Sequence, residues 1–236
     1  MKSWLQLFRV PNLFTVPGDP LAGFLLASAG AATPGPAVFL TIIASLSLYT
    51  FGLVLNDLMD YREDLAERPK RPLPSGAVNR TAAWLAAIIL PGLGLAICAR
   101  VGMMTFYFGC AIACAVIAYN CGLKKIPVAG AVIMGTCRGM NLLLGATLAN
   151  VLATPALGAA MIVTIYITGV TSVARMETAN PAIPPLIGRL IRALILIQAA
   201  FCAISGTGST GIICALVLAL ALWPLSRIVG RRFYAS

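Results

Sequence analysis

The stretch AVFLTIIASLSLYTFGLVLN, residues 37–56, is followed without a break by DLMDYREDLAERPKRPLPSGAVNR, residues 57–80. The first stretch carries no charged side chain and has the length of about 20 residues that an α-helix needs to cross a bilayer. The second stretch is crowded with charges and prolines, and charges are costly in a membrane interior. This abrupt change predicts a transmembrane helix over Ala37–Asn56 that opens into a polar segment at one membrane surface.

The composition of the whole chain extends this interpretation. Of its 236 residues, 60% are hydrophobic and 10% are charged, with a mean hydropathy of +0.94. A soluble domain carries about 25% charged residues and could not bury so much apolar surface at this size. The seven cysteines lie in or beside apolar runs without metal-ligand spacing, and histidine is absent. These features exclude a soluble globular protein, a disordered chain and a disulfide scaffold, and they leave a polytopic protein with the lipid bilayer as its partner.

Apolar runs separated by proline, glycine and charged breakers predict about eight membrane spans. The spans are Leu13–Gly30, Ala37–Asn56, Thr81–Ala99, Met103–Cys121, Val128–Ala149, Leu157–Val173, Leu186–Ser205 and Gly211–Ile228. They use nearly the whole chain. We therefore expect an all-α, polytopic transmembrane helical bundle that forms a single domain over residues 1–236.

The basic residues test this count. If the chain starts in the cytoplasm and crosses the membrane about eight times, 15 of its 17 Lys and Arg residues lie on the inner side. Of the other two, Arg100 lies on the outer side and Arg138 lies within a span. The outer loops near Pro34, Ala153 and Gly206 carry no charge. We expect an integral, multi-pass membrane protein with both termini in the cytoplasm. The same rule explains the net charge of +10, so nucleic acid is not an expected partner.

Five of the seven acidic residues lie within residues 57–67, at the inner end of the second span. If the helix continues beyond the membrane edge, Asn56, Asp60 and Asp64 stack on one face, and Asp57 joins them. Carboxylates this close repel one another unless cations neutralise them. Oxygen ligands without histidine or cysteine suit Mg²⁺, which combines few carboxylates with water and phosphate oxygens. The alternative is a set of solvated loop charges that pair among themselves.

The segment RPKRPLPSG, residues 68–76, presents three cations in a proline-stiffened loop. Arg68 and Arg71 can each grip phosphate oxygens with two hydrogen bonds, and the lysine between them acts as a point charge. A second basic pair, Lys124 and Lys125, lies at the inner end of the fourth span, where ordinary cytoplasmic positive charge is the alternative explanation. The acids and bases together predict a site for Mg²⁺ and a phosphate-bearing ligand.

These residues resemble a known family. The pattern Asn-Asp-x-x-Asp-x-x-x-Asp at residues 56–64, followed by Arg-Pro-x-Arg-Pro-Leu-Pro-Ser-Gly at residues 68–76, resembles the first signature of the UbiA superfamily of intramembrane prenyltransferases. Three weaker matches are Arg-x-Pro-Asn at residues 9–12, Tyr119 with the Leu-Lys-Lys that follows it, and Arg-Gly-x-Asn at residues 138–141. The resemblance covers about residues 9–176, most of the chain.

The resemblance implies a bundle of transmembrane helices around a central cavity. It implies an enzyme that binds an isoprenyl diphosphate through Mg²⁺ and transfers the prenyl group to a small acceptor, often an aromatic one. By matching position, it makes Asp57, Asp60 and Asp64 the catalytic residues and, together with Asn56, the ligands of Mg²⁺. It gives the contacts with diphosphate to Arg68, Arg71 and Lys125. It places Asn12 and Arg138 in the polar wall of the cavity.

The chain departs from the family pattern after its sixth span. The family has a second aspartate-rich motif there, but residues 171–180 of this chain contain no aspartate, and Glu177 is their only acid. Arg175 lies two residues before Glu177, so it either contacts the diphosphate in place of metal charge or pairs with that glutamate. The family also has nine helices where about eight spans are expected here.

Two further function classes remain open. One is a non-catalytic UbiA-like protein that binds or moves a prenylated or lipid-linked molecule and uses the first motif only for recognition. The other is an unrelated secondary transporter with a charged cytoplasmic loop. A transporter would account for the charge but not for the regular spacing of the acids, and the chain shows no pair of interrupted helices in matching halves.

Overall fold

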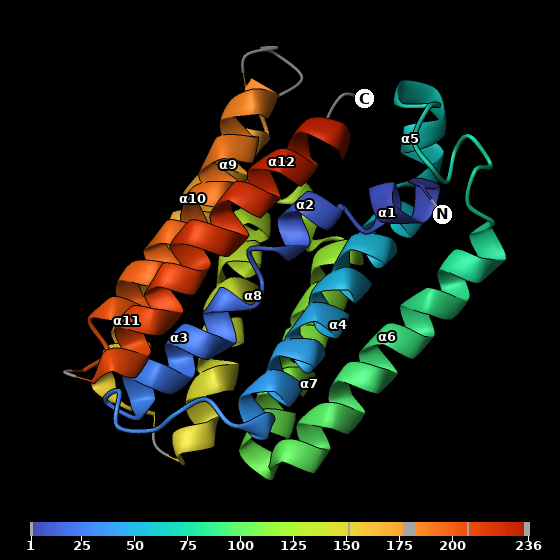
Figure 1. Ribbon diagram of the computed structural model, residues 1–236. Helices are drawn as coiled ribbons and strands as arrows, with labels where there is room; N and C mark the ends of the chain where they lie inside the picture. The colour runs from blue at the N-terminus through green and yellow to red at the C-terminus, as the bar shows by residue number, and fades with distance from the viewer. Residues whose placement is uncertain (1, 151, 177–182, 207, 234–236) are drawn as a thin grey trace.

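The computed structural model describes residues 2–150, 152–176, 183–206 and 208–233, and every regular element within these ranges is helical. Figure 1 shows long helices that run side by side, with the short helix α5 (Tyr61–Glu67) standing beyond the bundle at one end. Helix α1 (Lys2–Leu7) lies at the same end. We call this the motif end, because α5 carries part of the acidic pattern, and we call the opposite end the far end.

Seven helices of the described chain are long and apolar enough to cross a membrane. They are α4 (Pro36–Met59), α6 (Arg80–Val101), α7 (Met103–Asn120), α8 (Pro127–Ala146), α9 (Thr154–Ala174), α10 (Ile183–Ala203) and the continuous run of α11 (Ser209–Val217), the π-helical η3 (Leu218–Leu222) and α12 (Trp223–Phe233). They coincide with the second to the eighth predicted spans. The prediction of an all-helical, multi-pass integral membrane protein is confirmed.

The first predicted span, Leu13–Gly30, has a different structure. Helix α2 (Val10–Leu13) and helix α3 (Gly18–Ala27) are separated by a turn, and the 10 residues of α3 reach only about 15 Å, half of a bilayer core. Pro17 stands at the N-cap of α3, where the missing N–H of proline is tolerated. The span count of eight is therefore approximate: seven long helices accompany one interrupted segment.

The interrupted segment still carries the chain from the motif end to the far end (Figure 1). The end of α12 consequently lies at the motif end, as does α1. This placement agrees with an even number of passages through the bundle. The assignment of that end to the cytoplasm remains a prediction from the positive charges.

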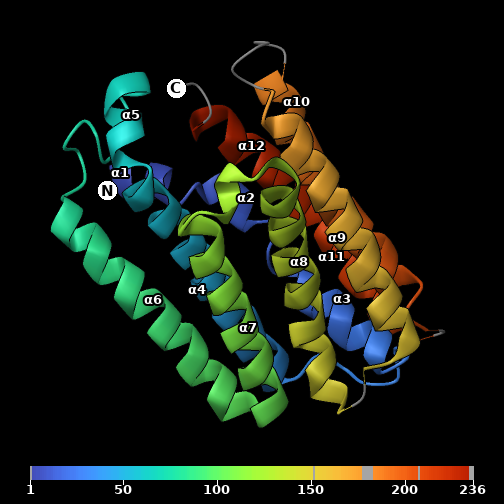
Figure 2. The same cartoon turned by 180° about the vertical axis from the view of Figure 1, so that it is seen from behind.

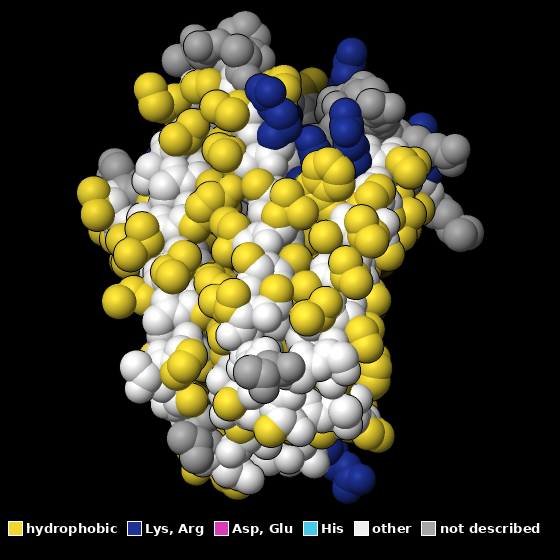
Figure 3. All heavy atoms as spheres, turned by 60° about the vertical axis from the view of Figure 1, so that its left-hand side comes forward, with side chains coloured by type: hydrophobic (Ala, Val, Ile, Leu, Met, Phe, Trp, Pro, Cys, Tyr) yellow, Lys and Arg dark blue, Asp and Glu magenta, His cyan; other side chains and the backbone are white. Residues whose placement is uncertain are grey.

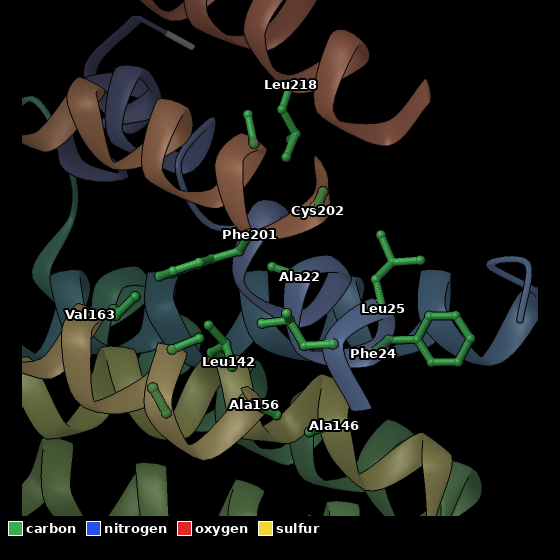
Figure 4. Close-up of a cluster of buried hydrophobic side chains, with 14 of the residues drawn as sticks. Ala22, Phe24, Leu25, Leu142, Ala146, Ala156, Val163, Phe201, Cys202 and Leu218 are labelled. Atoms are coloured by element: carbon green, nitrogen blue, oxygen red, sulfur yellow. The ribbon is translucent and has the colours of Figure 1, made fainter. Parts of the chain in front are cut away.

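The helices form two groups on either side of α3 and α8. Helices α4, α6 and α7 pack on one side, and α9 to α12 pack on the other, as the view from behind shows (Figure 2). A cluster of buried apolar side chains joins α3, α8, α9 and α10 (Figure 4), with Phe24, Leu142, Val163 and Phe201 among its members. The short helix α3 is thus the centre of the packed core.

The outside of the bundle is apolar around its middle. Large side chains such as Ile88, Ile165 and Leu220 are 66% to 72% exposed, which in water would favour aggregation and in a bilayer provides a lipid-facing surface. Figure 3 shows hydrophobic side chains over this belt, with most of the visible Lys and Arg side chains towards the upper end and one at the lower end. The surface therefore matches a bilayer with a basic rim at the motif end.

Close packing between α3 and α8 requires glycine. A Cβ atom on Gly145 would lie 1.9 Å from the carbonyl oxygen of Pro20, whereas a Cβ atom on Gly158 in α9 would meet nothing within 4 Å. We expect Gly145→Ala to lower the stability of the purified protein by about 1–3 kcal/mol, because backbone must move to admit the methyl group. The melting temperature in detergent measures this loss. Gly158→Ala is the matched control and should leave it unchanged or raise it; equal effects would contradict the packing.

Candidate functional site

Helix α4 delivers the acidic pattern to the motif end. Asp60 is a single irregular residue between α4 and α5, but the i to i−4 hydrogen bonds continue through it: its N–H donates to the Asn56 carbonyl, and the Asp64 N–H donates to the Asp60 carbonyl, both at 2.9 Å. Asn56, Asp60 and Asp64 therefore follow one another at intervals of one helical turn. The helix does continue beyond the apolar span, as the spacing of the acids predicts.

Each of the three aspartates is held by a cation from a different segment. Asp57 is buried and its Oδ1 lies 2.9 Å from the Arg9 guanidinium. The carboxylate of Asp60 accepts a hydrogen bond from Lys124 Nζ. Asp64 is also buried, and its two oxygens lie 2.8 and 3.0 Å from Arg71 Nη1. Repulsion among the carboxylates is thus compensated by protein cations.

Arg9 reaches Asp57 from the junction of α1 and α2. Its backbone is left-handed, with φ 45° and ψ 52°, a conformation that costs a non-glycine residue about 1–2 kcal/mol. Such strain persists only where the surrounding structure holds it. The ion pair with Asp57 is one interaction that holds it, and it fastens the amino-terminal segment to the acidic motif.

The proline-rich loop folds back over α5. Arg71 contacts Asp64, and Arg68 Nη1 lies 3.8 Å from the same carboxylate. Leu73 is buried in an apolar cluster with Leu7 and Val54, which anchors the loop on α1 and α4. The two predicted diphosphate-contacting arginines therefore lie together beside the last aspartate of the motif.

A cavity of about 190 Å³ extends from this site into the bundle between α4, α7 and α8. Arg9, Asn56 and Tyr119 line it near the motif end. Ser45 lines it 11 residues earlier than Asn56 on α4, which corresponds to a depth of about 16 Å. Between these polar ends the wall is apolar, with Leu48, Leu53, Ile112, Val116 and Met134.

A buried polar network closes the deep side of the cavity. Arg138 Nη2 lies 2.9 Å from Asp19 Oδ2 and donates to the Thr15 carbonyl at 2.7 Å. Asn141 donates to Asp19 at 3.1 Å and accepts from the Ser45 hydroxyl at 2.6 Å. The turn before α3 frees the Thr15 carbonyl from helical bonding. A buried ion pair is tolerated in an apolar core only with such additional hydrogen bonds.

The oxygen donors at the motif end suit Mg²⁺ in type. Over the described ranges, no three acidic side chains converge on one point. Mg²⁺ commonly takes one or two carboxylates and completes its shell with water and phosphate oxygens. Asp57 and Asp60, with the amide of Asn56, therefore fit a metal that arrives with a phosphate ligand rather than a closed protein cage.

The structure separates the two neighbouring lysines. Lys124 contacts Asp60, whereas Lys125, which the resemblance assigns to diphosphate, is exposed on the short helix η1 (Leu123–Lys125). Arg175 points to the same turn: its Nη2 donates to the Lys124 carbonyl at 2.8 Å and to the Ile126 carbonyl at 3.4 Å. Arg175 thus ties the end of α9 to η1.

The other predicted residues are placed as follows. Arg138 lines the cavity, as the resemblance implies. Asn12 is buried in α2, where its carbonyl accepts from the Thr15 hydroxyl, and it is not among the residues that line this cavity. Glu177 lies outside the described residues. The pairing of Arg175 with Glu177 therefore stays an expectation.

Sequence reasoning assigned no site role to Arg9 or Asp19, and it named Lys124 only as a member of a basic pair, with the diphosphate contact given to Lys125. Arg9 and Asp57 are 48 residues apart, and Asp19 and Asn141 are 122 apart, so no local spacing connects them. A second cavity of about 560 Å³ opens at the far end, between the start of α4, the α6–α7 turn and the end of α8. Its lining contains no charged residue, so it offers no cation for a phosphate ligand.

The contact of Arg175 with η1 has a measurable consequence. In Arg175→Ala we expect the amide hydrogens of Lys125 and Ile126, which close this turn, to exchange about tenfold faster, because two carbonyls of the turn lose a charged donor. Hydrogen–deuterium exchange with mass spectrometry measures the change. Arg189→Ala, which removes an exposed arginine of α10, is the matched control. Unchanged exchange in Arg175→Ala would show that the turn is held by other contacts.

Comparison with known proteins gives a family match and several relatives. The model of the UbiA prenyltransferase family matches residues 20–234. A protein of Sulfolobus acidocaldarius named digeranylgeranylglyceryl phosphate synthase is 29% identical over 167 residues, which cover 71% of this chain and 58% of the relative. A protein of the same name from Thermococcus gammatolerans is 33% identical over 95 residues, 40% of this chain and 34% of the relative. The chain spans about half the length of the curated relatives it matches.

Solved structures share the fold. A structure described as digeranylgeranylglyceryl phosphate synthase in membranes superposes with a TM-score of 0.66 at 20% identity and covers 98% of this chain and 95% of its own. A UbiA homologue from Archaeoglobus fulgidus bound to DMAPP and Mg²⁺ superposes with a TM-score of 0.65 at 15% identity, covering 99% and 89%. At these identities the likeness establishes the helical architecture alone.

Proposed function

Because the chain belongs to the UbiA prenyltransferase family, we propose that it is an Mg²⁺-dependent intramembrane prenyltransferase that uses an isoprenyl diphosphate. The observation that supports this most directly is the set of three aspartates with their separate cations at the motif end, where Arg9 and Asn56 also line a cavity with apolar walls. A diphosphate head suits the charged motif end, and a prenyl tail suits the apolar interior. The arrangement matches the two halves of an isoprenyl diphosphate.

For the acceptor we propose a glyceryl phosphate lipid. The relatives are named digeranylgeranylglyceryl phosphate synthase, a name that describes a glyceryl phosphate bearing two prenyl groups. This name favours a lipid alcohol over the aromatic acceptor that the superfamily resemblance alone suggested. In the reaction, the acceptor oxygen bonds to the first prenyl carbon, the carbon–oxygen bond to diphosphate breaks with its electron pair, and the products are an ether, diphosphate and a proton.

The residues at the motif end would bind and neutralise the diphosphate. Arg71, Arg68 and Lys124 can turn from their carboxylates to phosphate oxygens without leaving the site. Mg²⁺, when bound, would be held by Asn56, Asp57 and Asp60 together with phosphate oxygens, and it would stabilise the negative charge that develops on the departing diphosphate. The carboxylates and cations thereby exchange partners rather than lose them.

The cavity walls would protect the reacting carbon from water. An allylic carbon develops positive charge as the diphosphate leaves, and water would capture it. Leu48, Leu53 and Ile112 line the cavity below Asn56 with apolar side chains. Exclusion of water also strengthens the electrostatic interactions at the motif end.

A non-catalytic binding protein is the second candidate. Two observations support it. Among the described residues, no group of three acids could hold a metal in the absence of a phosphate substrate. Arg175 binds backbone carbonyls of η1. Such a protein would bind an isoprenyl diphosphate with Mg²⁺ and release it unchanged.

Turnover separates the two candidates. We expect the purified protein, given Mg²⁺, geranylgeranyl diphosphate and geranylgeranylglyceryl phosphate, to release diphosphate in a continuous phosphate-coupled assay. Asp60→Asn should reduce the rate at least roughly 100-fold, because the Mg²⁺ that would neutralise the developing charge loses an anionic ligand. Removal of Mg²⁺ by EDTA should have the same effect. Mg²⁺-dependent binding without any product would support the binding protein instead.

The two lysines give a matched comparison. We expect Lys124→Ala to raise the dissociation constant for geranylgeranyl diphosphate about tenfold, because a charge-assisted contact to phosphate is lost at a partly buried site. Lys125→Ala should leave it unchanged, since Lys125 is exposed on the same turn. Titration in detergent with Mg²⁺ present measures both values. The reverse order would restore the role that the family resemblance assigns to Lys125.

A further inference from the structure

Arg138 is buried in the cavity wall with most of its hydrogen-bonding capacity unused. It is 7% exposed, and its Nη2 carries the contacts to Asp19 and Thr15. Its Nε and Nη1 atoms have no hydrogen-bond partner. A guanidinium presents five N–H donors, so three of them remain unsatisfied inside the protein. Buried donors of this kind are costly, and one explanation for them in native proteins is a partner that the chain itself does not supply.

The other polar groups of this network that line the cavity, Asn141 and Ser45, are paired. Asn141 uses both ends of its amide, to Asp19 and to Ser45. Of the other unpaired buried atoms, Gln198 Oε1 and Ser226 Oγ belong to residues outside the cavity lining. Asn120 Oδ1 does belong to the lining, but it is an acceptor at the last residue of α7, near the motif end. The unused donors on the deep wall therefore belong to Arg138.

The position of Arg138 is deep and fixed. Its Cζ lies 5.5 Å from the ring centroid of Tyr49, a cation–π distance, and an aromatic face stabilises a cation without accepting its in-plane N–H groups. Tyr49 precedes Asn56 by seven residues on α4, which corresponds to about 10 Å along the helix. The unused donors are thus separated from the acidic motif by part of the apolar wall.

The charge of this wall decides what can bind there. Arg138 is already paired with Asp19, so the pair is neutral, and a further full anion would bring net negative charge into an apolar interior. A guanidinium grips carboxylates and phosphates along two edges, and both edges include Nη2. Asp19 and Thr15 occupy that nitrogen. The remaining donors suit single, neutral oxygen atoms.

We propose that Arg138 Nε and Nη1 form a deep subsite for an uncharged oxygen of the acceptor substrate, such as an ether, hydroxyl or carbonyl oxygen. This proposal rests on the proposed function, because it assumes that an acceptor enters the cavity. Asp19 and Gln198 are positioning residues: Asp19 fixes Nη2 of Arg138, and Gln198 donates to Asp19 and, at 2.8 Å, to the Thr15 carbonyl. The subsite would orient the acceptor while the cations at the motif end hold the diphosphate.

The test combines one conservative variant with three ligands. Arg138→Lys keeps a cation beside Asp19 but lacks the Nε and Nη1 donors. The ligands are geranylgeranylglycerol, which is neutral, geranylgeranylglyceryl phosphate, and geranylgeranyl diphosphate with Mg²⁺. We expect the variant to bind the first two about tenfold more weakly, by the same factor, and to bind the diphosphate as the wild type does. Arg100→Lys, at the exposed end of α6, is the matched control.

Each other outcome overturns the proposal in a distinct way. Weaker binding of the phosphorylated acceptor alone would make this an anion site, and unchanged binding of both acceptors would remove Arg138 from acceptor recognition. If wild-type protein binds the diphosphate but neither acceptor, the subsite is wrong while the donor site stands. If it does not bind the diphosphate with Mg²⁺ either, the proposed function fails as well.

A ligand-side measurement covers the case in which Arg138→Lys does not fold, which its melting temperature would reveal. Wild-type protein should bind geranylgeranylglycerol at least about tenfold more tightly than the C20 hydrocarbon that lacks the glycerol oxygens, measured by competition in the same detergent. Equal affinity would overturn the subsite without any variant.

Discussion

The structure depends on the neutralisation of three carboxylates at one end of α4. Asp57 and Asp64 are buried, and buried like charges within one helical turn or two cannot coexist uncompensated. The compensation comes from Arg9, Lys124 and Arg71, which belong to three separate segments of the chain. The amino-terminal helix, the proline-rich loop and the α7–α8 turn are therefore gathered at the same place. A phosphate ligand and a divalent cation would meet a site whose charges are already paired and can be re-paired.

A second pair of charges organises the centre of the bundle. Asp19 is fully buried and is bound by Arg138, Asn141 and Gln198 from α8 and α10. The interruption between α2 and α3 makes this possible, because the turn there leaves the Thr15 carbonyl available to Arg138 and Gln198. Irregular backbone at membrane depth is tolerated only where protein groups satisfy it. The cavity lies between the two charged centres, with one polar wall at each end and apolar side chains between them.

The chain keeps the fold of its family while changing one side of the site. The TM-scores of 0.65 and 0.66 arise at 15% and 20% identity, so the helical arrangement tolerates extensive substitution. The first acidic motif and its basic loop match the pattern on which the resemblance rests, whereas the segment after α9 begins with Arg175, which binds the backbone of η1. A direct contact between the end of α9 and η1 thus exists at the position where the resemblance implies a second set of aspartates. Function within a fold is decided by such local differences.

The sequence by itself determined the seven long membrane-spanning helices, the shared end of the acids and bases, and the family. These follow from composition, from helical spacing and from motifs that are continuous in the chain, such as residues 56–76. Only the tertiary structure decided that Lys124 rather than Lys125 contacts Asp60, that Arg9 holds Asp57, and that Arg138 is fixed by Asp19 through one nitrogen. The physical reason is that an ion pair is selected by where side chains meet in space. Segments 48 to 122 residues apart meet there because helix packing brings them together, and no local pattern in the chain records that packing.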